Sequence, residues 1–266
     1  MKRLHQRRQS TKLLYTAEEV KIGRVLGTGN FGQAVEGTLP CGTKVAVKIP
    51  NGKVDDEEVQ KELLNFMQIG RGHRNLLQFL GMVSLQGKPC LMSELCKGSL
   101  DRLHKEIDMT KPDRFLRIVT DVCSGLAHLH SRNIIHRDIA CRNLLMKSDG
   151  TVLISDYGLS RFLGSNDFYS GSHSAWAWMA PESFGSKGAY TKKSDVWMAG
   201  VTFWEIMTRG RTPYGNENPR EVVLRIICGT EKLPIPEIAK LDLYARGLIE
   251  SCLQHDPDDR PEFKHL

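Results

Sequence analysis

The chain has 266 residues, of which 40% are hydrophobic and 26% are charged, the balance of an ordinary globular protein. No apolar run approaches the roughly 18 residues of a membrane-spanning helix, so the sequence predicts no transmembrane segment. The formal net charge is +6, but five basic residues and no acidic one lie within residues 1–12, so the remainder is nearly neutral. A nucleic-acid-binding domain would spread lysine and arginine over a folded face, and the sequence therefore predicts no nucleic-acid partner.

Residues 1–19 begin the chain, and their charge and composition predict a disordered basic leader. The same charges would suit an anionic lipid surface, which attracts polybasic segments, so a role at a membrane stays open. The seven cysteines are widely spaced and include no C-x-x-C pair. They indicate reduced thiols and a cytoplasmic protein, either free or at the cytoplasmic face of a membrane.

The first part of the chain is predicted to be a small sheet. Apolar residues alternate around residues 22–26 and 45–49, as in half-buried strands, and two further strand patterns follow at 76–83 and 90–95. Residues 55–69, between the strand patterns at 45–49 and 76–83, change to a helical period. This pattern predicts a sheet lobe with one helix.

After residue 95 the pattern becomes mainly helical. Apolar residues recur at helical spacing within residues 115–129, 196–207 and 241–252. Short strands are predicted at 144–146 and 152–154, and the roughly 25 residues after them lack clear periodicity, a length that is typical of functional loops. The predicted fold class is α+β, with a mainly antiparallel sheet lobe at residues 20–95 and a larger helical lobe at residues 96–266.

A glycine-rich segment is the first feature that points to chemistry. Residues 26–35 contain G-x-G-x-x-G at Gly27, Gly29 and Gly32, and a second strand follows rather than the helix of a dinucleotide-binding fold. Glycines allow backbone amides to approach phosphates without obstruction from side chains. Taken alone, the segment would suit a flexible hairpin turn equally well.

Lys48 lies on the strand after this hairpin. The period of two places Ala46 and Lys48 on one face, where a small residue leaves room for a flat base and a lysine reaches phosphate. A lysine near a strand end is by default a solvated charge, so a functional role requires a partner. Glu62, one turn before Phe66 on the predicted helix, is the candidate, and Glu58 is the alternative.

Two motifs in the second lobe are far more specific. His136-Arg137-Asp138 and Asn143 form H-R-D-x-x-x-x-N, and Asp156 opens the later segment Asp-Tyr-Gly. With these motifs the chain resembles a eukaryotic protein kinase over residues 20–266. Further segments that match the family are Met179-Ala180-Pro181-Glu182, Ser194-Asp195-Val196-Trp197 and Asp256-Pro257-Asp258-Asp259-Arg260-Pro261.

The resemblance implies an enzyme that transfers a phosphoryl group from ATP with the help of Mg²⁺. Asp138 is expected to accept and orient the proton of the substrate hydroxyl. Lys48, held by Glu62, is expected to grip the α- and β-phosphates. Asn143 and Asp156 are expected to ligate Mg²⁺ through hard oxygens, which that ion prefers.

Alignment with the hinge of the family, the segment that holds adenine, places Ser93 at the gatekeeper position. A small residue there leaves a back pocket open, and Glu94 and Cys96 would offer backbone hydrogen bonds to the base. In the same family Glu182 resembles the partner of Arg260 in a structural ion pair. The nucleotide-binding residues implied by the resemblance are Leu26, Gly27, Gly29, Gly32, Val35, Ala46, Lys48, Ser93, Glu94, Cys96 and Leu145.

The catalytic loop resembles that of tyrosine kinases, with the receptor-like group as the best match. Ala140 stands where kinases acting on serine or threonine usually have lysine. Arg142 stands four residues after Asp138, as in the tyrosine-kinase form of the loop, and we count it among the catalytic residues. Residues 204–214 match W-E-x-x-T-x-G-x-x-P-Y. The expected function is therefore a protein-tyrosine kinase that acts on protein or peptide substrates.

Two departures from the family pattern limit this prediction. Residues 175–177 read Ala-Trp-Ala where a substrate tyrosine normally packs against Pro-Val-Arg or Pro-Ile-Lys, so a serine/threonine or dual-specificity kinase stays open. Tyr157 replaces the usual Phe, and its hydroxyl needs a partner if it is buried. We expect Tyr157 to pack with Phe66, Phe79 and His136 as a spine. A pseudokinase that binds nucleotide without turnover is a third hypothesis, disfavoured because the catalytic residue types are all present.

The long loop after Asp156 suggests regulation. We expect autophosphorylation at Tyr169, because Arg137 would offer a cation to a phosphate on this loop. Tyr15 is a second candidate, and phosphorylation between two copies would require self-association. The chain ends five residues after Pro261, whereas related domains continue through a last helix, so we expect that helix to be missing.

Overall fold

The structure of the protein, a computed structural model, describes residues 12–29, 32–50, 64–65, 69, 72–163, 169–170, 175–185, 188–235 and 242–266. These residues divide into two compact units. The first unit holds the described residues before Leu64 together with Gln78–Leu95. The second holds Leu64–Leu77 and Cys96–Leu266. The short segment 64–77, which we expected in the first lobe, therefore belongs to the second unit.

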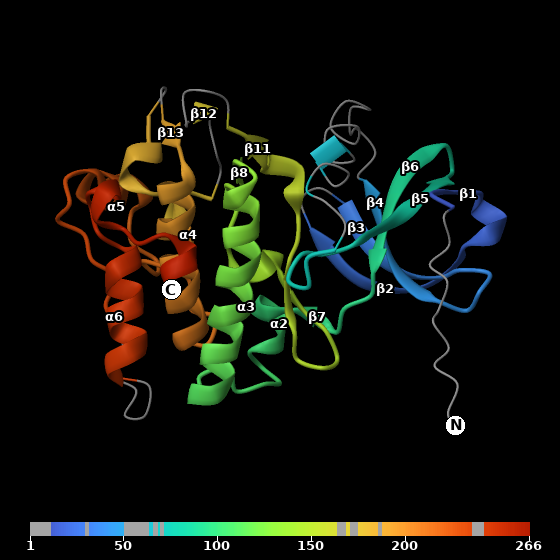
Figure 1. The fold of residues 1–266 in the computed structure, drawn as a ribbon, viewed down its shortest axis with the longest axis horizontal. Helices are drawn as coiled ribbons and strands as arrows, with labels where there is room; N and C mark the ends of the chain where they lie inside the picture. The colour runs from blue at the N-terminus through green and yellow to red at the C-terminus, as the bar shows by residue number, and fades with distance from the viewer. Residues whose placement is uncertain are drawn as a thin grey trace. The chain divides into compact units, whose positions relative to one another are not determined.

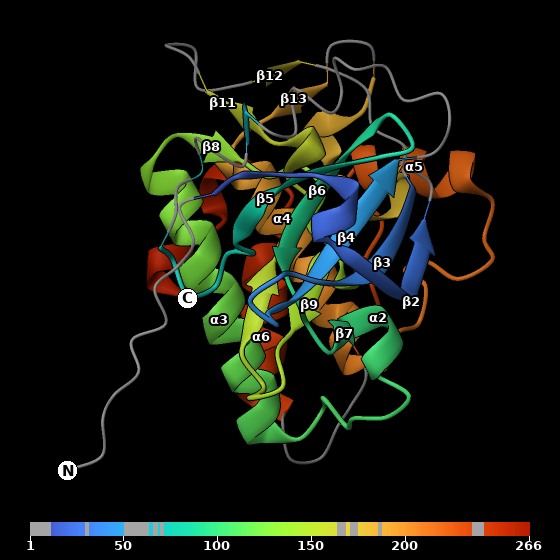
Figure 2. The same ribbon diagram turned by 90° about the vertical axis from the view of Figure 1, so that its right-hand side faces the viewer.

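The first unit is built on a six-stranded sheet with the strand order β1-β5-β6-β4-β3-β2. The order from β5 to β2 can be followed in Figure 2. Neighbouring strands are antiparallel, except that β1 and β5 are parallel. The core of this unit consists of Val20, Val35, Leu39, Val45, Val47, Val83, Cys90 and Met92. The strands are β1 (Leu14–Tyr15), β2 (Lys21–Gly29), β3 (Gly32–Thr38), β4 (Lys44–Pro50), β5 (Phe79–Leu85) and β6 (Lys88–Glu94).

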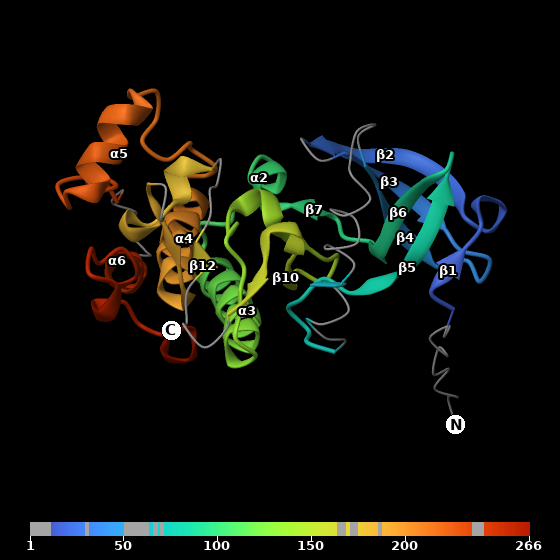
Figure 3. The same cartoon turned by 90° about the horizontal axis from the view of Figure 1, so that it is seen from above.

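The end of the predicted leader is ordered, which corrects the expectation of disorder for residues 12–19. Strand β1 lies along β5 at the edge of the sheet (Figure 3), and the Met82 amide donates a 2.7 Å hydrogen bond to the Leu13 carbonyl. The Tyr15 ring packs against the core of the sheet. A 3₁₀ turn, η1 (Ala17–Glu19), follows, and the Thr16 amide donates to the Glu19 carboxylate at 2.9 Å. Residues 1–11 lie outside the described part of the chain.

The second unit is mainly helical. Helix α4 lies between α3 and α6 (Figure 1), and every residue from Ser194 to Met207 is buried. Gly200 allows the close approach of α6, because a Cβ atom there would lie 2.7 Å from the Cβ of Cys252. The helices of this unit are α2 (Leu100–Leu103), α3 (Pro112–Ser131), α4 (Lys192–Met207), α5 (Pro219–Ile227) and α6 (Asp242–Cys252).

Short strands and 3₁₀ turns of the second unit carry the motifs. Strands β9 and β10 form a hairpin, with β7 on the other side of β9. The strands are β7 (Gly98–Ser99), β8 (Ile134–Ile135), β9 (Leu144–Met146), β10 (Val152–Ile154), β11 (Arg161–Phe162), β12 (Tyr169–Ser170) and β13 (Ala189–Tyr190). The 3₁₀ turns are η2 (Cys141–Asn143), η3 (Tyr157–Leu159), η4 (Trp176–Trp178), η5 (Pro181–Ser183), η6 (Pro257–Asp259) and η7 (Phe263–His265).

The predicted α+β class is confirmed, and both predicted strands of the β9–β10 hairpin match their observed bounds. The helices predicted within residues 115–129, 196–207 and 241–252 are α3, α4 and α6. The helix predicted at 55–69 lies almost wholly outside the described residues. Within the described ranges, the structure has no helix that combines the length and the apolar character needed to cross a membrane.

Candidate active site

The catalytic turn of the second unit centres on Asp138, a largely buried carboxylate. The Asn143 amide donates 2.7 Å hydrogen bonds to both the backbone carbonyl and Oδ2 of Asp138. The Arg142 guanidinium forms an ion pair with the other oxygen, Oδ1. One carboxylate is therefore held from two sides by side chains of η2, the turn that directly follows it. Charged hydrogen bonds of this kind fix both position and orientation.

The backbone before Asp138 is held by Asp195, a fully buried residue at the start of α4. Its two carboxylate oxygens accept hydrogen bonds from the His136 and Arg137 amides at 2.8 and 2.9 Å. The His130 ring lies 2.9 Å from the same carboxylate. This anchor supports a strained conformation, because Arg137 has a positive φ of 71°.

Asp156 is brought close to the catalytic turn by its neighbour Ser155. The Ser155 amide and hydroxyl both donate to the Asn143 carbonyl at 2.9 Å. Asp156 itself adopts a left-handed conformation, with φ of 61° and ψ of 70°. The two residues expected to ligate Mg²⁺, Asn143 and Asp156, thus belong to segments joined by backbone hydrogen bonds.

Their chemistry fits that ion. Within the described ranges, no group of three or more His, Cys, Asp or Glu side chains could hold a metal by itself. Mg²⁺ is usually bound by one or two carboxylates together with substrate phosphates, and an all-protein cage is not required. Because the Asn143 amide nitrogen donates to Asp138, its amide oxygen is the atom left to serve as a ligand beside Asp156.

Tyr157 is fully buried, and its hydroxyl has the partners that the sequence requires. The hydroxyl donates to the Ile154 carbonyl at 2.6 Å and accepts from the Leu77 amide at 3.1 Å. The ring meets His136 edge-to-face, with ring centres 5.9 Å apart. Tyr157 and His136 are two of the four residues of the predicted spine, and both lie in the second unit. Phe66 lies outside the described residues, and Phe79 belongs to the first unit.

A layer of side chains beneath the catalytic turn was not predicted from the sequence. The Arg142 guanidinium lies over the Trp178 ring, 5.0 Å from its centre. Glu205, on α4, accepts hydrogen bonds from the Trp178 indole at 3.3 Å and from the Cys141 amide at 3.0 Å. Burial raises the pKa of the Glu205 carboxyl and of the Cys141 thiol. The available signal was a carboxylate in the mainly apolar part of α4 that follows Asp195, since a buried carboxylate must find donors.

In the first unit, strand pairing places several predicted nucleotide-binding residues on one face. Ala46 is directly opposite Ser93, and Lys48 is opposite both Leu91 and Ala34. Residues that are directly opposite in a sheet point to the same side. The shared face of Ala46, Lys48 and Ser93 agrees with the period-two prediction.

Val35 does not lie on that face. It is opposite Val47, is only 3% exposed, and belongs to the core of the sheet. Side chains alternate along a strand, so Ala34 takes the position beside Lys48 that we expected for Val35. We therefore replace Val35 by Ala34 among the candidate nucleotide-binding residues.

The glycine-rich hairpin is formed by β2 and β3. Gly27 is paired with Ala34, and Gly29 is paired with Gly32. Gly32 has a φ of 148°, and a side chain there would collide with the Ile49 carbonyl. Leu26 lies at an irregularity of the β2–β3 pairing and is half-buried. Asn30 and Phe31, between the last two glycines, lie outside the described residues.

The other predicted residues are distributed over both units. Glu94 ends β6, where its amide donates to the Gln78 carbonyl at 3.2 Å and its carboxylate accepts from the Gln78 amide at 3.0 Å. Cys96 and Leu145 belong to the second unit and pack on its core. Glu62 and Glu58 lie outside the described residues, and for Tyr169 the structure describes the backbone alone.

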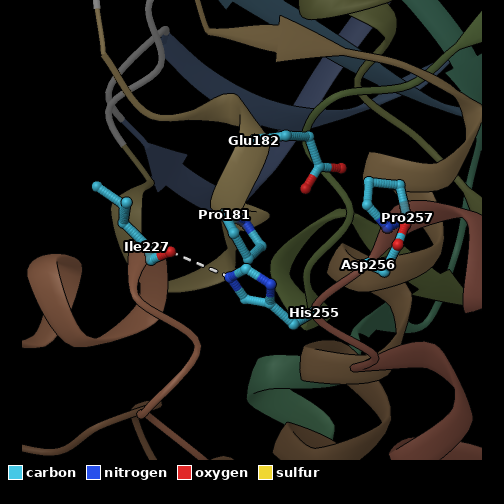
Figure 4. A pocket seen from close by; sticks show the side chains of 6 residues that line it. All are labelled: Pro181, Glu182, Ile227, His255, Asp256 and Pro257. Atoms are coloured by element: carbon cyan, nitrogen blue, oxygen red, sulfur yellow. Dashed lines mark hydrogen bonds between the residues drawn. The ribbon is translucent and has the colours of Figure 1, made fainter.

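A separate open cavity of about 380 Å³ is lined in part by Glu182 (Figure 4), the ion-pair partner of the buried Arg260. Within it, the His255 ring is hydrogen-bonded to the Ile227 carbonyl at 3.0 Å. None of its lining residues belongs to the catalytic turn, which is consistent with a structural role for this region. The lining residues are Pro181, Glu182, Ile227, His255, Asp256 and Pro257.

Comparison with known proteins agrees with this arrangement. Residues 20–266 match the sequence profile of the family described as protein tyrosine and serine/threonine kinase. The chain is 35% identical over 267 residues to the mouse (Mus musculus) tyrosine-protein kinase Mer, covering 92% of this chain and 26% of that protein. It is 34% identical over 269 residues to the tyrosine-protein kinase transforming protein RYK of avian retrovirus RPL30, covering 93% of this chain and 60% of that protein.

A relative named as a serine/threonine-protein kinase matches a similar share of this chain. The chain is 30% identical over 253 residues to the serine/threonine-protein kinase STY46 of Arabidopsis thaliana, covering 94% of this chain and 43% of that protein. The chain thus spans less than two thirds of the length of each of these three relatives.

Proposed function

The chain belongs to the family of protein tyrosine and serine/threonine kinases, and from this premise we propose that it transfers the γ-phosphate of ATP to tyrosine hydroxyls of protein substrates. The observation that carries the proposal is the Asp138 carboxylate, held by the Asn143 amide and the Arg142 guanidinium. Catalysis of phosphoryl transfer depends on positioning the reactants and stabilising charge more than on covalent chemistry by the protein. The hydrogen bonds that hold Asp138 provide the positioning.

In the proposed reaction, the substrate hydroxyl oxygen forms a bond to the γ-phosphorus. The bond from that phosphorus to the bridging oxygen breaks, and ADP leaves with the electron pair. Asp138 orients the hydroxyl and receives its proton. Arg142 and Asn143 keep the carboxylate aimed at the attacking oxygen, because each binds a different oxygen of the same group.

The nucleotide would be bound by the shared face of the first unit and by the glycine-rich hairpin. Lys48, with Glu62 as its expected partner, would bind the α- and β-phosphates, and Ala34 and Ala46 leave room for the flat base. Asn143 and Asp156 would hold Mg²⁺. When bound, Mg²⁺ neutralises charge that develops on the phosphate oxygens.

Specificity for serine and threonine is a second candidate, favoured by one observation. Trp176, which stands where the family pattern has Val or Ile, stacks on Tyr214 with ring centres 6.0 Å apart and an interplanar angle of 24°. This segment is the strip on which a substrate tyrosine would pack. The serine/threonine-protein kinase relative also keeps dual specificity among the candidates.

We further propose regulation by phosphorylation of Tyr169, with self-association of two copies for transfer between them. The partners are then protein substrates and a second copy of the chain. A cytoplasmic location, including the cytoplasmic face of a membrane, is part of the same proposal, since it rests on the basic leader and the reduced thiols.

The deciding experiment is a labelled-phosphate transfer assay with identification of the labelled residue, comparing wild type with Asp138→Asn. Loss of the proton acceptor should lower the rate by about 100-fold to 10,000-fold. Asp149→Asn is the matched control, because Asp149 is an exposed turn residue that binds the Thr151 amide. Label on phosphotyrosine supports the proposal, and label confined to phosphoserine and phosphothreonine selects the second candidate. Nucleotide-induced thermal stabilisation without ATP turnover would indicate a pseudokinase.

A further inference from the structure

Glu205 is a buried acidic side chain that the reaction described above does not use. It is 7% exposed and lies in the last turn of α4, which is otherwise packed in the core of the second unit. Its Oε2 atom accepts two hydrogen bonds, from the Cys141 amide at 3.0 Å and from the Trp178 indole at 3.3 Å. A buried carboxylate is costly, so its retention beneath the catalytic turn calls for a reason.

The two donors belong to segments that meet at Arg142. Cys141 is the first residue of η2, the turn that carries Arg142 and Asn143. Trp178 ends η4, and its ring supports the Arg142 guanidinium at 5.0 Å. Glu205 therefore fixes both the backbone from which Arg142 projects and the aromatic surface on which its guanidinium lies.

We propose that Glu205 is a positioning residue for phosphoryl transfer. It acts through Trp178 and Arg142, which in turn hold the Asp138 carboxylate in the orientation that accepts the substrate proton. The inference rests on the proposed function in one respect, the role of Asp138 as proton acceptor.

Other contacts hold the catalytic turn in place without Glu205, so the positioning role can be tested separately from support of the fold. The catalytic turn has another link to α4 one turn earlier, where the Thr202 hydroxyl donates to the Ile139 carbonyl at 3.1 Å. Asp195 holds the preceding backbone. Removing Glu205 should therefore leave the turn attached to α4 and release mainly the indole and the guanidinium. Because small displacements of a reacting group cost up to about 100-fold in rate, the effect should appear in turnover.

The test compares Glu205→Met with Glu205→Gln in steady-state kinetics, at a temperature where melting curves show every variant to be folded. Methionine has a similar size and no strong acceptor, so both donors lose their partner. We expect kcat to fall by about 10-fold to 100-fold, with KM for ATP changed less than about 2-fold. Glutamine keeps a carbonyl oxygen for the donors and should restore kcat to within about 5-fold of wild type.

A second pair of variants separates the hydrogen bond from the aromatic surface and covers the case that Glu205→Met does not fold. Trp178→Phe keeps a ring under the guanidinium, whereas Trp178→Leu removes it, so kcat should fall further in the leucine variant. Trp204→Phe is the matched control. It removes another indole hydrogen bond of α4, to the Pro234 carbonyl at 2.8 Å, and should leave kcat within about 2-fold of wild type.

A double-mutant cycle with Arg142→Ala gives the decisive reading. If Glu205 acts through Arg142, Glu205→Met should change kcat by less than about 2-fold in the Arg142→Ala background. Independent effects that multiply, or an unchanged kcat in Glu205→Met, would overturn the inference while leaving the proposed function intact. Failure of the wild type itself to transfer phosphate would overturn the proposed function, and this inference with it.

Discussion

The guanidinium of Arg137 lies over the ring of Tyr190, 4.3 Å from its centre. Tyr190 is in turn the strand partner of Tyr169, because β12 and β13 pair antiparallel with these two residues directly opposite. The backbone of the proposed phosphorylation site is therefore paired with the residue that supports the cation. Arg137 also donates to the Leu159 carbonyl at 3.2 Å, which ties it to the segment after Asp156.

The first prediction concerns Tyr169→Phe. A phosphate on Tyr169 would gain charge-assisted hydrogen bonds, each worth about 1.5–3 kcal/mol, so activation on the order of 10-fold is expected. Preincubation with ATP should raise the activity of the wild type and not that of Tyr169→Phe. Tyr15→Phe is the control for the other candidate tyrosine. Equal activation of wild type and Tyr169→Phe would contradict the prediction.

The sequence was most informative where a period or a motif is local. The alternation of residues in β4 predicts that Ala46 and Lys48 lie on one face of the sheet. The pairing of Ala46 with Ser93 adds Ser93 to that face, as expected. The assignment of Val35 was wrong by one residue, because the count within the glycine motif does not fix the pairing register. Val35 is opposite Val47, and a shift of one residue turns a side chain to the other face of a sheet.

Features that depend on distant contacts were missed. Strand β1 has two residues, too short to show a period, and exists through its parallel pairing with β5. Helix α5 has nine residues, only about two and a half turns, so its apolar period repeats too few times to stand out in the sequence. The role of Glu205 depends on Cys141 and Trp178, which are distant in sequence and meet only in the folded unit.

The second prediction concerns the ion pair of Arg260 and Glu182. The Arg260 guanidinium is fully buried and forms two parallel hydrogen bonds with the carboxylate, at 2.6 and 2.9 Å. Arg260→Met would leave Glu182 without its cation, and removing one partner of a buried pair costs about 3–5 kcal/mol. Urea unfolding should show that loss in the free energy of unfolding.

The matched control is Lys264→Met, which removes an exposed pair with Glu262 at 2.8 Å. Exposed ion pairs contribute about 0–1 kcal/mol, so this variant should unfold close to wild type. If Arg260→Met and Lys264→Met unfolded at the same urea concentration, the assigned structural role of Arg260 would be wrong.

The third prediction concerns Ser93 as the gatekeeper. Ser93 is opposite Ala46 on the face that also carries Lys48, so a methionine there would fill space beside the base. Ser93→Met should weaken bulky hinge-binding inhibitors by at least about 10-fold, since overpacking costs about 1–3 kcal/mol, and KM for ATP should change little. Inhibition curves measure this directly. Ser84→Met, at an exposed position of β5, should not alter them, and equal inhibition of all three proteins would refute the hinge alignment.

The fourth prediction is a pH dependence from His73 and His128, whose rings stack with centres 4.6 Å apart. Burial lowers the pKa of both imidazoles, and each ring also faces positive charge, from Arg74 at His73 and from Arg132 at His128. Because the folded pKa values lie below the ordinary value of 6.5, the neutral forms stabilise the fold. This stability is present above about pH 6.5 and is lost as the pH falls through the folded values.

Urea unfolding between about pH 7.5 and pH 5 should therefore show a decrease in the free energy of unfolding that is smaller in the double variant His73→Gln, His128→Gln. The control is His265→Gln, at an exposed position. A wild-type curve parallel to that of the double variant over this range would show that the pair does not contribute.

The last prediction concerns Gly81, which allows the end of the leader to lie along β5. Gly81 has a φ of 151°, and a Cβ atom there would lie 2.7 Å from the Leu13 carbonyl oxygen and 3.2 Å from the Tyr15 ring. Gly81→Ala should therefore separate β1 from β5 and expose the Met82 amide, which donates to that carbonyl. Gly87→Ala isolates the cost of backbone strain, on the order of 1–3 kcal/mol, because Gly87 has a φ of 77° with no atom within 4 Å of the added Cβ. Hydrogen exchange of the Met82 amide should accelerate in Gly81→Ala and not in Gly87→Ala, and equal protection in both variants would show that the contact with Leu13 does not hold β1 in place.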